Sequence, residues 1–514
     1  MSRPSRLSNV ASPERAGAKE WIALAALMLP VLLVSVDNTV LSFALPQIAE
    51  ALQPSATEQL WIIDAYPLVL AGLLVTMGSM GDRFGRRKLL LIGATGFAVI
   101  SVLATFSETA FQLILARAFL GFFGAMLMPS TMSLLRSTFR DREQRRLAIA
   151  IWASGFAAGS AMGPLVGGLL LANFPWGSVF LIAVPVLVPM LILVPLLVRE
   201  SRDPNPGPID PLSILLSMVA MFGVVYAIKH FASEGFDVLG VAFLVAGLAV
   251  GYLFVRRQLR RPIPLLEVRL FKNGMFSGAI LVNLLSVIAL VGFLFFVSQH
   301  LQIVLGLDPV AAGLVLLPGM IIMIVFGLAI VPIARRVPPT ILVPIGLLVS
   351  AAAYLLIAVA PSDPSVGRMM LAFAMLGAGI GAAETISNDL ILAEAPANKA
   401  GAASALSETA YEVGAVLGTA LLGGILTANY RSELKLPSAL SPADGAIASE
   451  TLAGAHNVSE RVGGSLGDEV MAAATHAFES GVGLTSMLGA ILMVAAAVVA
   501  WRTLRPQAEP VLTK

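Results

Sequence analysis

Apolar runs separated by short polar or basic stretches recur along almost the whole chain. Each run holds about 20 residues, which is the length that an α-helix needs to cross the roughly 30 Å hydrocarbon core of a bilayer. The pattern therefore predicts an all-α polytopic membrane protein with fourteen spans. The predicted spans cover residues 21–46, 59–80, 88–107, 110–135, 147–171, 176–198, 211–231, 237–256, 275–300, 310–334, 339–360, 368–392, 401–428 and 482–503.

Two polar segments divide these spans into groups of six, two and six. Residues 199–211 follow the sixth span, and the basic segment 256–273 follows the eighth. We therefore expect two six-helix bundles joined by an inserted hairpin, and repeated bundles commonly place a substrate path at their interface. The predicted units are an amino-terminal tail with the first bundle at 1–200, the hairpin at 201–264, the second bundle at 265–505, and a tail at 506–514.

One loop is much longer than the others. Residues 429–480 separate the last two spans and contain a helix-like stretch at 468–480. Long loops with their own secondary structure are often functional. A gate or cover for the transport path and a loop without any role are equally compatible with the sequence.

Composition and charge placement agree with a membrane location. The chain is 57% hydrophobic and 12% charged, and a soluble domain carries about twice that share of charge. With the amino terminus in the cytoplasm, 27 of the 33 Lys and Arg residues fall on the cytoplasmic side, five fall outside, and Arg117 is buried. This asymmetry follows the positive-inside rule. It predicts that both termini are cytoplasmic.

Several functional classes lack support in the sequence. There is no cysteine, and the four histidines are scattered, so no thiolate or histidine metal site is predicted. We find no nucleotide-binding loop, no nucleophile with a matching base, and no large soluble domain. The chain is therefore not expected to be an enzyme or to bind nucleic acid or a cofactor, and the proton gradient remains as the energy source.

Carboxylates inside the predicted spans are the main functional signal. Arg117 is the only basic residue that we place inside a span, so most of these acids have no expected counter-charge. A carboxylate in hydrocarbon is costly, and such residues commonly mark ion and substrate pathways. Acids without partners suggest protons and cationic cargo. The candidates are Asp37, Asp64, Glu384, Glu408 and Glu412.

Glu408 and Glu412 are four residues apart and so share a helix face. Two close carboxylates in a low dielectric cannot both ionise cheaply, so we expect one of them to hold a proton near neutral pH. A bound organic cation would favour the ionised form and expel that proton. The alternative is a structural carboxylate hydrogen-bonded to a neighbouring helix, and for Glu384 the two roles are equally supported. Tyr411 lies on an adjacent face and could line the same cavity only obliquely.

Asp37 and Arg117 lie at similar depths in their spans and could form a structural ion pair. Asp64 is flanked by Trp61 and Tyr66. Aromatic faces attract lipophilic cations, so these two rings could form an aromatic cavity beside the acid. The alternative is that they anchor the helix at the membrane interface, where Trp and Tyr are common.

The segment 78–90 connects the second and third spans, at the cytoplasmic surface in the predicted orientation. Its glycines predict a tight turn that holds an acid against neighbouring helix ends and arginines, where each charge gains ~0.3–1 kcal/mol from the helix dipole. Such contacts could act as a latch that biases which side is closed. An ordinary positive-inside loop is the alternative. The candidate gating residues are Gly78, Asp82, Arg83, Gly85 and Arg86, together with Arg117.

Small residues line one face of the fifth predicted span. Gly155, Gly159 and Gly163 recur every four residues, which allows a neighbouring helix to approach closely. Pro164 lacks a backbone donor and is expected to bend the helix. A sealed, bent interface would limit proton leak, although generic small-residue packing would look similar. Gly167 and Gly168 extend the pattern.

These segments resemble those of a known family. Residues 78–90 resemble the signature loop of the major facilitator superfamily. Three other segments resemble its drug:proton antiporter branch with fourteen spans, including the exporters' antiporter motif. Leu120 departs from the fourth-helix motif, where the family usually has a polar residue. The three segments are 36–46, 115–121 and 159–170.

Two further segments, 60–72 and 407–418, are similar to the QacA/SmvA group of multidrug exporters. The resemblance implies that Asp37, Asp64, Glu408 and Glu412 serve in substrate recognition or protonation. We expect an exporter in a bacterial inner or cell membrane, in contact with lipid; a monomer is expected, and the sequence leaves the oligomeric state open. The expected function is export of lipophilic organic cations, such as quaternary ammonium compounds, biguanides and dyes, in exchange for protons. The alternative is proton-coupled export of one metabolite, siderophore or neutral drug.

Overall fold

The structure is a computed structural model that describes residues 15–139, 141–202, 210–359, 365–395 and 400–505. Its regular secondary structure in these ranges is entirely helical. The first helices form one bundle, in which the short α6 continues into α7. They are α1 (Ala18–Leu52), α2 (Ala56–Phe84), α3 (Arg86–Thr105), α4 (Ala110–Thr138), α5 (Arg142–Asn173), α6 (Ser178–Leu181) and α7 (Ala183–Leu197).

A helical hairpin and a second bundle follow. The hairpin consists of α8 (Pro211–Glu234) and α9 (Val238–Arg260), and the 3₁₀ turn η1 (Val268–Lys272) leads into the second bundle. Its α-helices are α10 (Gly274–Gln299), α11 (Pro309–Ala334), α12 (Pro339–Ala358), α13 (Val366–Ala393), α14 (Ala400–Gly418), α15 (Gly424–Glu433), α16 (Pro442–Glu450), α17 (Leu452–Val462) and α18 (Gly464–Thr503). The second bundle also contains two π-helical turns. The turn η2 (His300–Val304) follows its first helix, and η4 (Thr419–Gly423) lies between α14 and α15.

Thirteen helices of the described ranges are long and apolar enough to cross a membrane. The predicted fifth span corresponds to α5, which is 32 residues long, although only its apolar part Met162–Asn173 stands out by composition. The all-helical, multi-pass architecture expected from the sequence is therefore confirmed.

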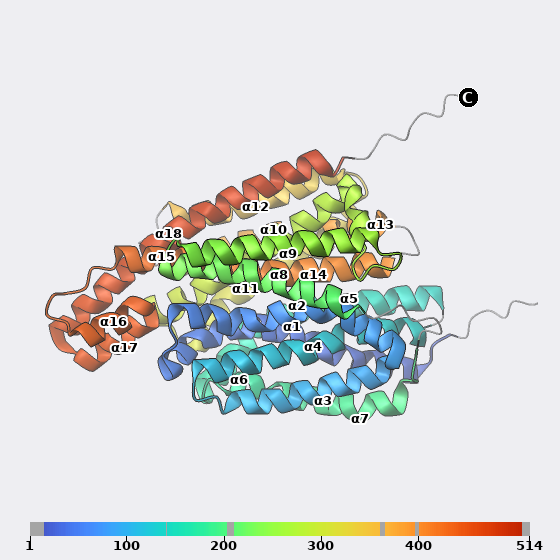
Figure 1. The fold of residues 1–514 in the computed structure, drawn as a ribbon, viewed down its shortest axis with the longest axis horizontal. Helices are drawn as coiled ribbons and strands as arrows, with labels where there is room; N and C mark the ends of the chain where they lie inside the picture. The colour runs from blue at the N-terminus through green and yellow to red at the C-terminus, as the bar shows by residue number, and fades with distance from the viewer. Residues whose placement is uncertain (1–14, 140, 203–209, 360–364, 396–399, 506–514) are drawn as a thin grey trace, which may run out of the picture.

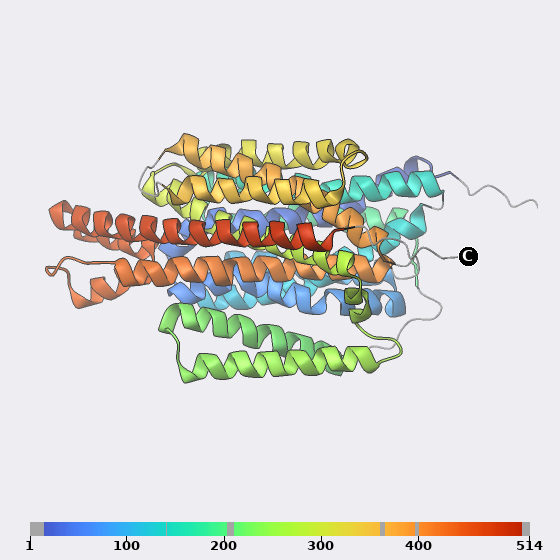
Figure 2. The ribbon, with the colours of Figure 1, turned by 90° about the horizontal axis from the view of Figure 1, so that it is seen from above.

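The helices run roughly parallel to the long axis of the molecule (Figure 1). The hairpin α8–α9 lies along one side, next to helices of both bundles (Figure 2). Its α8 packs against α2 of the first bundle and against α15 and η4 of the second. At one end of the molecule, α16 and α17 project beyond the bundles, and the carboxyl-terminal end of α18 lies at the opposite end (Figure 1).

Two predicted boundaries differ from the structure. The first span was expected to end at Pro46, but α1 continues to Leu52 with Pro30 and Pro46 inside it. Proline is tolerated in membrane helices because neighbouring groups satisfy the freed carbonyls. The last span was expected to start at residue 482, but α18 starts at Gly464 and so contains the helix-like stretch 468–480. Contacts with α15 and α17 support this extension.

The glycines of α5 pack against α1. A Cβ added at Gly159 would lie 2.6 Å from the Cβ of Ser35, and one added at Gly167 would lie 2.9 Å from Val40 Cγ2. Gly155 and Gly163 face the same helix. The predicted close approach along one face is therefore confirmed, and α1 is the helix that makes it.

Gly168 lies on a different face of α5 and contacts the second bundle. A Cβ added there would lie 2.6 Å from the carbonyl oxygen of Pro309, at the start of α11. Reciprocally, a Cβ on Gly313 of α11 would lie 2.6 Å from the carbonyl oxygen of Pro164. The two bundles therefore meet backbone to backbone at the end of the molecule that carries α16 and α17.

The turn between α2 and α3 is fixed by an ion pair and a helix cap. Asp82 pairs with Arg86 at 2.7 Å. Gly85 has a φ of +115°, which favours glycine. Glu200, which follows α7, accepts hydrogen bonds from the backbone N–H groups of Arg87 and Lys88 at 2.9 and 3.1 Å. This carboxylate caps the amino-terminal end of α3, as the helix dipole favours. Sequence reasoning missed Glu200.

The other predicted members of this turn have simpler surroundings. Gly78 packs against α4, where an added Cβ would lie 3.3 Å from Pro129 Cβ. Arg83 is exposed. The turn thus ties α2 and α3 to the segment after α7, all within the first bundle. Its role as a latch stays a prediction.

The base of the hairpin is held by a charged cluster. Arg257 and Arg261 of the α9 end pair with Asp210, the amino-terminal cap of α8, at 2.9 and 3.2 Å. The hydrogen bonds from Arg257 lower the pKa of Asp210 to about 2. These contacts join the start of α8 to the end of α9.

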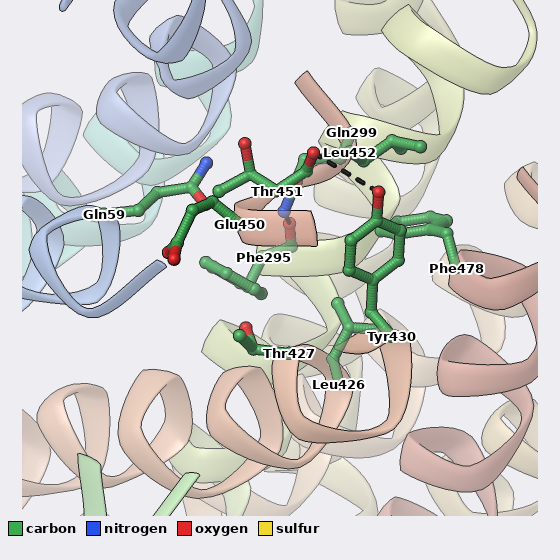
Figure 3. A pocket seen from close by; sticks show the side chains of 10 residues that line it. All are labelled: Gln59, Phe295, Gln299, Leu426, Thr427, Tyr430, Glu450, Thr451, Leu452 and Phe478. Atoms are coloured by element: carbon green, nitrogen blue, oxygen red, sulfur yellow. Dashed lines mark hydrogen bonds between the residues drawn. The ribbon is translucent and has the colours of Figure 1, made fainter. Parts of the chain in front are cut away.

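A layer made of α16 and α17 covers the end of the two bundles. Glu450 of α16 accepts a hydrogen bond from the backbone N–H of Ala56 in α2 at 3.0 Å and also pairs with Arg431 of α15. The Tyr430 hydroxyl donates to the backbone of Ala448 and Thr451. Figure 3 shows the small cavity behind this layer. Its volume of about 20 Å³ is far too small for a drug-sized molecule.

Candidate functional site

Asp37 of α1 and Arg117 of α4 form a buried ion pair. Arg117 Nη1 lies 2.6 Å from Asp37 Oδ2, and its Nε donates to the carbonyl of Ile62 in α2 at 3.2 Å. The expected pairing of these two residues is therefore confirmed. The pair joins three helices of the first bundle through one guanidinium group.

Tyr66 packs against this guanidinium group inside the protein. The Arg117 Cζ lies 4.6 Å from the centre of the Tyr66 ring, and the ring is fully buried against Phe97. Tyr66 therefore does not anchor α2 in a membrane interface, which was one of the two interpretations of this residue. It forms part of the wall around Arg117 instead.

Asp64 of α2 has a counter-charge that the sequence did not indicate. Lys229 Nζ of α8 lies 2.8 Å from Asp64 Oδ2, and both side chains are 0% exposed. We counted Lys229 among the outer basic residues and Arg117 as the only buried basic residue, and the second assignment is wrong because Lys229 is buried in the protein. The reason is that α8 packs against α2, so a lysine near the end of this helix is covered by the neighbouring helix.

Trp61 completes the surroundings of this ammonium group. Lys229 Nζ lies 4.1 Å from the centre of the Trp61 ring. The other contacts of Trp61 include a stacked Phe222, also on α8. Trp61 is thus an aromatic contact for a cation that belongs to the protein, and its contact with cargo stays a prediction.

Glu412 of α14 is buried at the boundary between the bundles. It is 6% exposed, and one of its oxygens has no hydrogen-bond partner among the described residues. Asn38 of α1 interacts with it from the first bundle, and Asp37 and Arg117 lie within electrostatic range. No basic residue of the described ranges pairs with Glu412. The expectation of an unpaired acid holds at this position.

Glu408 lies one turn away on the same helix and is only half-buried. Its electrostatic neighbours include Glu412 and Arg136 of α4. The two glutamates thus differ in their access to water. Glu412 is enclosed, and Glu408 leads towards the end of the molecule opposite α16 and α17, because α14 runs from that end.

Glu384 of α13 is the third acid without an ion-pair partner in the described part of the chain. Its Oε1 is buried and has no hydrogen-bond partner there. Tyr411 lies within electrostatic range of both Glu384 and Glu412. Tyr411 therefore faces the same group of acids more directly than its position beside Glu412 suggested.

Polar residues that the sequence did not single out lie near these acids. Asn283 of α10 donates to the Oδ1 of Asn388 in α13 at 2.7 Å, and the Ser407 hydroxyl donates to the same oxygen at 3.0 Å. Amides inside apolar helices were visible in the sequence. Their convergence was not, because three separate helices contribute.

Most of the predicted site residues thus form two neighbouring groups, one around Glu412 and one around Lys229. The remaining ones lie in two separate regions, the α2–α3 turn and the glycine face of α5. Asp37, Arg117 and Tyr66 lie within electrostatic range of Glu412, as does Glu408, and Tyr411 lies within range of both Glu412 and Glu384. Asp64 and Trp61 surround Lys229 nearby. No cluster of metal-ligand residues occurs among the described residues, and the site holds acids suited to protons and organic cations.

Comparison with known sequences gives consistent matches over almost the full length. The profile described as "Major Facilitator Superfamily" matches residues 27–419. The multidrug efflux pump LfrA of Mycolicibacterium smegmatis is 53% identical over 488 residues, covering 95% of this chain and 97% of that protein. The methyl viologen resistance protein SmvA of Salmonella typhimurium is 33% identical over 480 residues, covering 93% and 97%.

A further relative is the tetracenomycin C resistance and export protein of Streptomyces glaucescens. It is 32% identical over 490 residues, which cover 93% of this chain and 91% of that protein. Among solved structures, a bacterial homologue of the human lysosomal transporter Spinster matches with a TM-score of 0.65 and 17% identity. That match covers 96% of this chain and all of the other, and it supports the fold alone.

Proposed function

The chain belongs to the major facilitator superfamily and is a drug-efflux transporter of it, and we propose that it exports lipophilic organic cations in exchange for protons. One observation carries the proposal. Glu412 is buried where the two bundles meet, and it lacks a basic partner among the described residues. An enclosed carboxylate without a counter-charge is stable with either a proton or a cationic ligand beside it.

The geometry supports a simple exchange cycle. A cation that binds beside Glu412 stabilises the ionised carboxylate and so releases its proton. A proton that binds there removes the charge that holds the cation. Half-buried Glu408, one turn away, offers a path for protons or cargo from the end of the molecule opposite α16 and α17. Cargo and proton thus exclude each other at one site, which is what antiport requires.

Contacts at the two ends suggest the orientation and the state of the transporter. We propose that α16 and α17 lie outside the cell and that both termini are cytoplasmic, in the inner or cell membrane of a bacterium. The bundles meet at the α16–α17 end through Gly168 and Pro309, and Gln302 Nε2 donates to the carbonyl of Phe43 at 3.1 Å. The structure then corresponds to a state that is closed to the outside.

Transport in inside-out vesicles tests this function directly. We expect a proton gradient, acid inside the vesicle, to drive uptake of the fluorescent cation ethidium by the wild type. The variant Glu412→Gln keeps the size of the side chain but cannot ionise. Gradient-driven uptake should therefore fall at least tenfold, because the loss of a buried charge beside a cation costs several kcal/mol. Dye fluorescence in the vesicles is the measurement.

A matched carboxylate controls for expression and charge. Glu469, exposed on the outer part of α18, is replaced in Glu469→Gln and should leave uptake unchanged. Ethidium uptake by the wild type that ignores the gradient would overturn proton coupling. Full uptake by Glu412→Gln would move the proton site away from α14.

The relatives also favour a second candidate function. The Streptomyces glaucescens relative is described by a single antibiotic, tetracenomycin C. Proton-coupled export of one specific drug or metabolite would use the same exchange at Glu412. Wild-type vesicles that transport no organic cation under a gradient would favour this alternative.

A further inference from the structure

The inserted hairpin places a positive charge between the two bundles. Lys229 of α8 lies against Asp64 of α2 at 2.8 Å, and neither side chain is exposed. Around them, α8 packs on α2 and on η4 and α15, and apolar contacts of Val225 with Leu68 and Val416 close the seam. Figure 2 shows the hairpin along this side. Lys229 is therefore held at a junction of all three units.

The surroundings of Lys229 are those of a binding site for an organic cation. A carboxylate lies on one side of the ammonium group, and the ring of Trp61 lies on another with its centre 4.1 Å away. An aromatic face and an acid are what recognises quaternary ammonium ligands. Thr419 and Arg117 are the other groups that interact with Asp64. The site predicted for cationic cargo at Trp61 and Asp64 is thus occupied by a side chain.

Lys229 also changes the net charge of the residues that we propose to bind cargo. Arg117 neutralises Asp37, and Lys229 neutralises Asp64. Without Lys229 the two neighbouring groups would carry one more negative charge. A buried pair of this kind contributes little to stability compared with apolar residues of the same size, so stability alone does not account for its presence.

We propose that Lys229 is a specificity-determining residue, whose ammonium occupies the cation subsite of Trp61 and Asp64 and so lowers by one the positive charge that the transporter accepts from its cargo. This inference rests on the proposed export of organic cations. It assigns a task to the hairpin, because α8 carries the lysine. A dication is the cargo that the occupied subsite disfavours most.

Two dyes that differ by one charge test the inference. Ethidium is a monocation, and propidium has the same ring system with an added quaternary ammonium group. Fluorescence titration of the purified protein at pH 8 gives a Kd for each dye, and the ratio of the two cancels general effects on stability. We expect Lys229→Met to shift this ratio in favour of propidium on the order of tenfold, since one uncompensated charge acts at short range in a low dielectric.

Three further variants define the controls. Lys229→Arg keeps the charge and should keep the wild-type ratio. The double variant Asp64→Asn/Lys229→Met removes both charges and should return the ratio to within about twofold of the wild type, because the net charge is restored. Lys435→Met removes a lysine that is exposed in the α15–α16 loop and should change nothing.

The outcomes separate the inference from the function on which it rests. An unchanged ratio in folded Lys229→Met would show that Lys229 only anchors the hairpin, and it would overturn the inference. If that variant does not fold, Asp64→Asn gives the opposite test, because its unpaired lysine should disfavour propidium by a similar factor. Equal ratios in Asp64→Asn and the wild type would also overturn it. Failure of the wild type to bind either dye would overturn the proposed function as well.

Discussion

At the scale of single residues, the two buried ion pairs near the candidate site differ in what the sequence could reveal. Asp37 and Arg117 lie at matching depths, so their contact could be predicted. Lys229 lies five residues before the end of α8, and we counted it with the basic residues of the outer side although the predicted span 211–231 contains it. A sequence pattern locates the apolar core of a span better than its ends. Asp64 was therefore expected to be unpaired.

The Asp37–Arg117 pair leads to a prediction about stability. Replacing Arg117 by Met leaves Asp37 buried without a partner, and we expect a loss of about 3–5 kcal/mol in the free energy of unfolding. The double variant Asp37→Asn/Arg117→Met should recover a large part of this loss, since no charge remains buried. Unfolding by sodium dodecyl sulfate titration of the purified protein is the measurement.

An exposed pair provides the control for this experiment. Arg461 pairs with Asp444 at 2.8 Å, and its side chain is 55% exposed. Arg461→Met should change the free energy of unfolding by about 1 kcal/mol or less. If Arg117→Met lowered the free energy of unfolding no more than this control, Asp37 would have to take up a proton when its partner is missing. A role of Asp37 in the proton path would then be the better interpretation.

At the scale of elements, α5 uses its small residues on two faces with different consequences. The spacing of Gly155, Gly159 and Gly163 predicts a close helix neighbour, and α1 is that neighbour within the first bundle. Gly168 breaks the spacing and contacts α11 of the second bundle. Periodicity could not reveal this second contact, because it depends on how the two bundles meet.

This difference predicts that alanine at Gly168 changes the population of the closed state, whereas alanine at Gly159 changes only the stability of the protein. Gly168→Ala introduces a clash with Pro309 that exists only while the bundles are closed at the α16–α17 end. An overpacking cost of ~1–3 kcal/mol in that state would shift its population by roughly five- to 150-fold. Gly159→Ala crowds α1 in every state, so it should lower stability without moving the equilibrium.

Spin labels can measure the shift because the chain has no cysteine. Labels on Asn173→Cys and Leu305→Cys report the distance between the ends of α5 and η2, and we expect this distance to lengthen in Gly168→Ala. Gly251→Ala is the control, since the nearest atom to an added Cβ there is 3.7 Å away. An unchanged distance in Gly168→Ala would mean that the backbone around Gly168 and Pro309 adjusts to the added methyl group while the bundles stay closed.

At the scale of the whole molecule, the sequence predicted the all-helical, multi-pass architecture, because burial in lipid imposes a strong and regular pattern. The grouping of Asp37, Glu412 and Asn38 across the two bundles is visible only in the structure. The sequence also left open whether residues 429–480 have a role. In the structure they form a layer that contacts both bundles. This contact leads to a testable prediction that the loop holds the two bundles together.

Glu450 is the residue through which this layer holds the two bundles together. Its carboxylate accepts a hydrogen bond from Ala56 of the first bundle and pairs with Arg431 on α15. A charge-assisted hydrogen bond contributes about 1.5–3 kcal/mol, and α2 must leave Glu450 when the transporter opens at this end. Glu450→Gln keeps the shape but loses the charge. We therefore expect it to lengthen the Asn173–Leu305 label distance, by less than Gly168→Ala does.

The same distance measurement distinguishes a lock from a passive cover. Glu460→Gln, on the exposed face of α17, should leave the label distance unchanged. If Glu450 locks the closed state, the lengthening in Glu450→Gln should be reproduced in wild-type protein at high salt, because Arg431 and Glu450 are partly exposed and salt screens their attraction. A wild-type distance in Glu450→Gln at both salt concentrations would show that the layer follows the bundles and does not hold them.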